Sequence, residues 1–156
     1  MAQSGPGTTD APSVLPISLS FPLPKAPETR LHLQLTIHKT SILLFLTTAL
    51  SGDLSTTAPL GSFVYALPDR INPGQTLSTP LYTYESSVEF TTRLAKLLAR
   101  KTGKATYVGN SISFASAGMG GTVEEEMEGF RKVVEVVMME VKKSEGVGEE
   151  VLGAGN

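Results

Sequence analysis

The sequence of 156 residues contains no cysteine, few charged residues and no long apolar run. Because cysteine is absent, disulfides, thiol nucleophiles and thiolate metal sites are all excluded. Charged residues make up 18% of the chain and the net charge is −2, which gives no reason to expect a nucleic-acid partner. The N-terminus lacks a basic start and an apolar run of signal-peptide length, and no stretch approaches the length of a membrane span. We therefore expect a soluble protein, cytoplasmic or nuclear, that contacts no membrane.

The most regular pattern lies at residues 31–50, which contain two apolar runs. In Leu31–His38, apolar and polar side chains alternate strictly, which is typical of a β-strand with one apolar face. The polar side chains belong to His32, Gln34, Thr36 and His38, and the apolar ones to Leu31, Leu33, Leu35 and Ile37. After a polar turn, Ile42–Leu46 is apolar at both parities, as in a strand buried on both faces. The two runs predict a hairpin at the centre of a sheet whose two faces both need a cover.

Weaker strand patterns surround this hairpin. From Val14 an alternation begins that is bracketed by prolines, which indicates an edge strand or an extended arm, since proline cannot donate to a ladder. Leu60–Leu67 predicts a strand, and Leu77–Tyr84 predicts a shorter one. Ala105–Phe114 predicts another strand, with Gly109-Asn110 as a candidate break.

Two capping-box patterns, Ser86 to Glu89 and Thr122 to Glu125, mark the starts of two helices. Gly103 predicts the C-terminal end of the first helix. The apolar stripe expected on the first helix consists of Phe90, Leu94, Leu97 and Leu98. The stripe expected on the second helix consists of Val123, Met127, Phe130, Val134, Val137 and Val141.

The order of elements predicts an α+β domain at residues 14–143, with a mainly antiparallel sheet of about five or six strands and two helices on one face. Residues 1–13 are mostly Gly, Pro, Ser, Thr and Ala and predict a disordered tail, and the glycine-rich residues 144–156 predict a flexible C-terminal tail. Two helices cannot easily cover both faces of a sheet. The other face therefore needs the N-terminal arm or a second subunit, and we expect it to be used in dimerisation.

No residue pattern supports an enzyme, a cofactor or a metal. His32 and His38 share a strand face, but six residues of strand separate their backbones by about 20 Å, so they cannot share one ion. The acidic run Glu124–Glu126 is typical of a solvated first helical turn. The glycines of Gly118–Gly121 lack the spacing of a phosphate-binding loop and a following Lys-Ser/Thr. We expect no catalytic residue here.

One surface feature is basic. Arg93, Lys96 and Arg100 fall on one stripe of the first helix, with Lys101 and Lys104 nearby. These cations are either a solvated face with favourable charges at a helix end, or a docking patch for an acidic protein surface.

Four segments resemble the proteasome assembly chaperone 4 family. The most specific is RLAKLLARKTGKATYV at Arg93–Val108, a helix that runs through Thr-Gly-Lys into a strand. EEEMEGF at Glu124–Phe130, the hairpin at Leu31–Leu46 and LSTPL at Leu77–Leu81 match in order, so the resemblance covers roughly residues 31–130. The Pro-rich N-terminal arm, the glycine-laden loop at 115–121 and the longer C-terminal helix depart from the family pattern.

The resemblance implies a non-enzymatic α+β protein that pairs with a related partner, proteasome assembly chaperone 3. It implies that the pair holds α-subunits of the 20S proteasome during α-ring assembly and leaves before the particle matures. The hypothesis for partner contact is the row His32, Gln34, Thr36 and His38, and that for α-subunit contact is Arg93, Lys96, Arg100 and Lys101. The alternatives are a generic interaction module or homodimeric scaffold, and a small-molecule-binding or enzymatic domain that uses the glycine loop.

Overall fold

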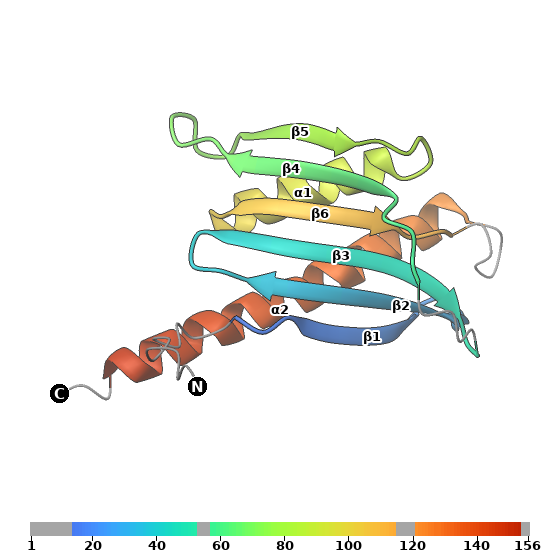
Figure 1. Cartoon of the computed structure of the whole chain (residues 1–156), viewed down its shortest axis with the longest axis horizontal. Coiled ribbons are helices and arrows are strands. Elements are labelled where there is room, and N and C mark those ends of the chain that lie inside the picture. The colour runs from blue at the N-terminus through green and yellow to red at the C-terminus, as the bar shows by residue number, and fades with distance from the viewer. Residues whose placement is uncertain (1–13, 53–56, 115–120, 154–156) are drawn as a thin grey trace, which may run out of the picture.

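The computed structural model describes residues 14–52, 57–114 and 121–153. These residues form one six-stranded sheet with two helices on the same side of it (Figure 1). The strands are β1 (Ile17–Leu23), β2 (Ala26–Ile37), β3 (Ser41–Leu50), β4 (Ser62–Pro68), β5 (Thr76–Tyr82) and β6 (Ala105–Ser111), and the helices are α1 (Val88–Thr102) and α2 (Val123–Gly153). The predicted α+β class is therefore confirmed.

The strands are arranged in the order β1-β2-β3-β6-β4-β5. Every neighbouring pair is antiparallel except β3 and β6, which are parallel. Helix α1 packs behind β4, β5 and β6, while α2 crosses behind the half of the sheet that contains β2 (Figure 1). None of the helices in the described ranges combines the length and the apolar character that crossing a membrane requires.

The predicted hairpin is β2 and β3. Strand β3 lies at the centre of the sheet beside β6, and β2 lies between β3 and the edge strand β1. Leu33 lies opposite Leu46 and Leu35 opposite Leu44, and all four side chains are buried beneath the helices. The other parity of β3, which includes Leu43, is only half-buried. The second face of this strand is therefore apolar, but the described chain does not cover it completely.

The N-terminal arm forms β1, which pairs with β2 at the edge of the sheet. Ile17 and Leu19 point toward the helix side, because they lie opposite the buried Leu35 and Leu33. Residues 17–23 thus extend the sheet and do not lie across its second face. The tail predicted for residues 1–13 falls outside the described residues, and the division into domain and tails stays a prediction.

Helix α1 begins one residue later than the sequence indicates. The predicted cap, Ser86, is wrong: Ser87 occupies the N-cap position and makes no side-chain capping bond. Its hydroxyl is instead 2.8 Å from that of Ser62 in β4 and also contacts the Tyr84 carbonyl. A buried polar contact to the sheet thus replaces the local cap. At the other end Gly103 has φ 68° and its N–H donates to the Ala99 carbonyl, as predicted.

The capping box of α2 is confirmed. The Thr122 N–H donates to Oε2 of Glu125 at 3.1 Å, and the Glu125 N–H donates to Oγ1 of Thr122 at 3.3 Å. The helix continues to Gly153, through most of the segment that the sequence assigns to a tail.

The apolar stripe predicted for α2 is wrong at its start. Val123 is 73% exposed and Met127 is 52% exposed. The buried row consists of Glu125, Gly129, Val133, Val137 and Val141, at steps of four residues, so the predicted Val137 and Val141 are buried. The predicted Phe130 and Val134 are half-buried and pack against the core. Gly129 belongs to this row because the Phe114 ring packs on it, and a Cβ there would lie 2.9 Å from that ring.

Strand β6 runs through Gly109-Asn110 without the predicted break. Asn110 is fully buried, and its side chain makes two hydrogen bonds that a central strand can accommodate. Its amide nitrogen donates to the hydroxyl of Thr91 in α1 at 3.2 Å, and its oxygen accepts from the Ile112 N–H at 2.9 Å. The two hydrogen bonds offset the cost of burying this asparagine, and its bond to Thr91 connects α1 to the sheet. Of the glycine loop Gly118–Gly121, only Gly121 is described.

Candidate functional site

The face of the sheet opposite the helices is the candidate site, and we call it the open face. In the described ranges, both helices lie on the other side of the sheet, so neither covers the open face (Figure 1). Side chains of the second parity on all six strands point to it. It divides into an aromatic half over β3, β6, β4 and β5, and a polar half over β1 and β2.

Four rings form a continuous row across three strands of the aromatic half. We call Phe45, Phe63, Tyr107 and Tyr65 the aromatic row. The ring centroids are 6.1 Å apart for Phe45 and Phe63, 6.3 Å for Phe63 and Tyr107, and 4.5 Å for Tyr107 and Tyr65. All four side chains are half-buried. A row of stacked rings that remains partly wet is typical of a surface that another protein covers.

The strand register explains how the row forms. Tyr65 lies directly opposite Tyr107 on the antiparallel pair of β4 and β6. Phe63 and Phe45 both lie beside Gly109, one on each side of β6. A Cβ at Gly109 would lie 2.7 Å from the Phe45 ring, so the missing side chain lets that ring lean across β6 toward Phe63.

The apolar surface continues to the edge strand β5. Leu67 and Leu77 lie opposite each other and are 36% and 63% exposed, and Tyr82, opposite Phe63, is 58% exposed. Desolvation of the Tyr65 phenol and the neighbouring Tyr107 side chain together raise the pKa of Tyr65.

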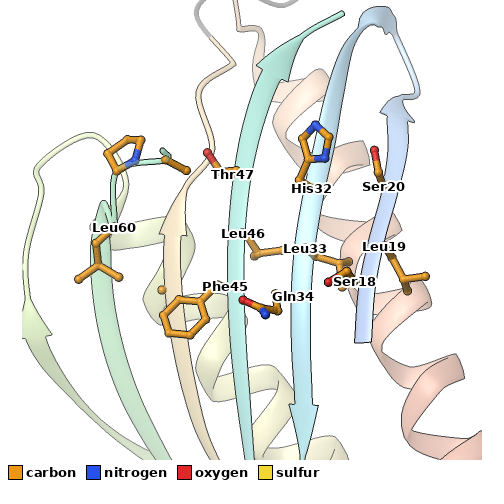
Figure 2. A pocket seen from close by; sticks show the side chains of 13 residues that line it. Ser18, Leu19, Ser20, His32, Leu33, Gln34, Phe45, Leu46, Thr47 and Leu60 are labelled. Atoms are coloured by element: carbon orange, nitrogen blue, oxygen red, sulfur yellow. The ribbon is translucent and has the colours of Figure 1, made fainter. Parts of the chain in front are cut away.

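The polar half is built by the pairing of β1 with β2. Ser18 lies opposite Gln34, and Ser20 lies opposite His32. Arg30 holds the edge, since its Nε donates to the Ser20 hydroxyl at 3.0 Å. Over β1, β2 and β3 lies a hollow of about 610 Å³, which is bordered on its β4 side by Ala58, Pro59 and Leu60 (Figure 2).

The basic stripe lies on the opposite side of the molecule. Arg93, Lys96, Arg100 and Lys101 are all exposed on α1, and none of them makes an ion pair with a described residue. The guanidinium of Arg93 lies 5.4 Å from the centroid of the Phe130 ring on α2. The fold therefore places three of the four residues predicted for partner contact on the open face, and all four residues predicted for α-subunit contact on the opposite side of the sheet. In the described part of the chain, no three potential ligands are grouped to hold a metal ion.

A family model for proteasome assembly chaperone 4 matches residues 30–112, which is more than half of the chain and runs from β2 through β6. The chain belongs to the proteasome assembly chaperone 4 family. One similar solved structure is a chain from a crystallised chaperone complex for yeast 20S proteasome assembly. The two chains share 16% of their residues at a TM-score of 0.60, over 81% of this chain and 96% of that one, which is a likeness of fold. No curated protein matches the chain.

The segment that defines membership of the proteasome assembly chaperone 4 family contains the aromatic row and the basic stripe, whereas β1 and the whole of α2 lie outside it. Both candidate surfaces are therefore centred on family elements.

The open face includes three of the four residues that the sequence predicts for partner contact. His32, Gln34 and Thr36 point to it, because they alternate with the buried leucines of β2. His38 follows the last residue of β2: its N–H donates to the Ser41 carbonyl at 2.8 Å, and its own carbonyl accepts from Nζ of Lys104 at 3.1 Å. That these residues contact a partner stays a prediction.

Sequence reasoning missed the aromatic row. The alternation of Phe63 and Tyr65 in β4 and the apolar second parity of β3 were available signals. They could not be combined, because the row depends on β6 lying between β3 and β4. That order is set by long-range pairing, which a local pattern does not contain.

Proposed function

We propose that this chain is a non-catalytic assembly chaperone that pairs through its open face with a related chaperone of the proteasome assembly chaperone 3 type. The resulting pair binds α-subunits of the 20S proteasome and promotes assembly of the α-ring. The observation that carries the proposal is the aromatic row, which lies half-buried on a sheet face that no described helix covers. Membership of the proteasome assembly chaperone 4 family supplies the role in proteasome assembly.

Physical reasons support pairing through this face. Two sheets pack face to face at about 10 Å when their inner side chains interdigitate, and aromatic side chains are the usual anchors of such contacts. Phe63 and Tyr65 already have their rings oriented by their neighbours in the row. Little side-chain entropy is therefore lost when a partner covers them.

The partner interface is tested by hydroxyl-radical footprinting of the chain alone and of the copurified pair. We expect oxidation of Phe63, Tyr65 and Tyr107 to fall on pairing, because the partner excludes water from their rings. Met139, which is 49% exposed on α2 at the back of the sheet, is the internal control and should oxidise equally in both samples. Equal oxidation of the three rings before and after pairing would show that the partner binds elsewhere.

A homodimeric scaffold is the second candidate, since the aromatic row can also stack on its own copy about a twofold axis that crosses the strands. Mass spectrometry of the purified species separates the two. A single sequence at twice the chain mass supports the homodimer, and two related sequences support the chaperone pair.

Contact with the α-subunit is assigned to the basic stripe. We expect the double substitution Arg93→Glu with Arg100→Glu to slow capture of an α-subunit, because exposed rim charges act mainly on the rate of association. Both side chains are exposed, so the domain should stay folded. Arg70→Glu with Lys142→Glu is the matched control, since it changes the same charge at exposed positions away from the stripe. If the variant with Arg93→Glu and Arg100→Glu captured the α-subunit at an unchanged rate, the basic stripe would be excluded as the contact surface.

A further inference from the structure

On the helix side of the sheet, the N-terminal halves of α1 and α2 enclose a groove of about 510 Å³. Both helices begin at the same end of the sheet, so the groove runs along both (Figure 1). Its floor is apolar: Phe130 packs edge-on against Phe90 at a centroid distance of 5.3 Å, and Leu97 and Val134 continue the floor beyond them. The fold thus provides a rigid base between two helices.

The rim of this groove carries apolar side chains that the fold does not use. Met127 is 52% exposed and Val123 is 73% exposed, although both were predicted to be in the core. The buried row of α2 passes through other residues, so neither side chain holds the helix on the sheet. Apolar side chains that line a groove and remain exposed are typical of an interaction site.

The charges on the rim are ordered along the groove. Glu89 and Glu126 lie nearer the starts of the two helices, and Arg93 and Arg131 follow four and five residues later. Acids and bases are thus both present, yet no ion pair among the described residues includes any of the four. The groove therefore offers an acidic end and a basic end, and none of these four charges is neutralised by an ion pair within the described chain.

We propose that this groove binds an amphipathic helix of the 20S α-subunit. The apolar side of that helix packs between Met127, Phe130 and Leu97. A carboxylate on it meets Arg93 and Arg131, and a lysine or arginine about one turn away meets the acidic end. The inference rests on the proposed function for the identity of the client, and it extends the basic stripe, since Arg93 belongs to both surfaces.

Charge complementarity argues against a segment of the same chain as the occupant. Residues 1–13 contain one charged side chain, Asp10, and no cation to meet Glu89 or Glu126. They also contain few large apolar side chains that could fill the floor.

The test uses the copurified chaperone pair and a panel of separately purified 20S α-subunits. Met127→Ser removes the apolar rim, and Arg131→Glu reverses one end of the groove. Met139→Ser and Lys142→Glu are the matched controls, because they make the same changes at exposed positions of α2 outside the groove. We expect each groove variant to bind its α-subunit about tenfold more weakly, and each control to stay within about twofold of the unaltered pair. Thermal unfolding and the mass of the pair should be the same for all four variants.

The outcomes are distinguishable. If the unaltered pair captures an α-subunit and the groove variants capture it equally well, the groove proposal is overturned while the proposed function stands. If the unaltered pair captures no α-subunit, both fail together. Light scattering of the chain alone supplies the last outcome: if the chain self-associates and Met127→Ser abolishes this without affecting capture, the occupant is a second copy and the proposal is wrong.

Discussion

Replacement of Phe63 by serine tests whether the aromatic row is the anchor of the pair. The Phe63 ring occupies the middle of the row, between Phe45 at 6.1 Å and Tyr107 at 6.3 Å. It is half-buried in the single chain, and it points away from the core beneath the helices. The substitution should therefore lower the stability of the single chain by one amount and weaken pairing by another.

The two parts have calculable sizes. Full burial of a phenylalanine side chain contributes roughly 1.5–3 kcal/mol, so the half already buried stabilises the single chain by about 1 kcal/mol. Each of the two ring contacts adds up to about 1.5 kcal/mol to this stabilisation of the single chain. The exposed half becomes buried only when a partner covers the face, which adds about 1–2 kcal/mol to pairing. Phe63→Ser should consequently raise the dissociation constant of the pair by roughly five- to thirtyfold.

Isothermal titration with the related chaperone measures pairing, and urea denaturation measures folding. Ile71→Ser is the control for loss of an exposed apolar side chain, since Ile71 is 87% exposed in the turn between β4 and β5. It should change the dissociation constant of the pair less than twofold, which is about the effect of an ordinary surface substitution. His32→Ser probes the polar half of the open face and should cost about fivefold or less. A folded Phe63→Ser chain that pairs as tightly as the unaltered one would refute the assignment.

The remaining predictions concern turns that position the open face. Gly61 has φ +69°, and a Cβ there would meet the Asn110 carbonyl oxygen of β6. Gly61→Ala should therefore lower the free energy of unfolding in urea by roughly 3 kcal/mol or more. Gly74→Ala should lower it by only about 1–2 kcal/mol, because Gly74 has φ +98° but no atom lies within 4 Å of a Cβ added there. Similar costs for both would contradict the close approach. In the β4–β5 turn, hydrogen bonds from the Ile71 and Asn72 N–H groups lower the pKa of Asp69. The Asp69 carboxylate therefore stabilises the fold fully above the unfolded pKa of about 3.9, and this stabilisation is lost as pH falls through the lower folded pKa. Asp69→Ala should therefore be less stable than the unaltered chain at pH near 6, and a gap in unfolding midpoint that persists in strong acid would exclude the carboxylate as its cause.

Local periodicity was sufficient to predict the hairpin and to predict which side of its first strand is buried. The alternation in Leu31–Ile37 indicates one buried side, and the structure buries Leu33 and Leu35 and exposes His32 and Gln34 as expected. This works because a strand has a side-chain period of two that depends on no other element. The same holds for Gly103, where only a backbone position after a helix is needed.

Tertiary contacts account for the errors. The Ser86–Glu89 pattern has the right spacing for a cap, but the serine beside it is bonded to Ser62 of β4, and that contact sets the helix start. The valines and methionines of α2 fit two adjacent stripes, and the one in contact with the core was selected by Gly129, on which the Phe114 ring packs. Neither distant partner can be recognised from a local pattern. Such tertiary contacts override local propensity wherever two registers are nearly equal.

The central strands relate the two candidate surfaces to each other. Val108 in β6 lies buried beneath the helices, while its neighbour Tyr107 stands in the aromatic row on the other side. The same alternation places Leu44 under the helices and Phe45 in the row. In the described residues the two helices cover one side of the six strands, and the open face on the second side is where we propose that the related chaperone binds. Because the groove lies between those helices and the row lies behind them, a partner on one surface does not occupy the other. Pairing and client capture can therefore occur together on one small domain, as an assembly chaperone requires.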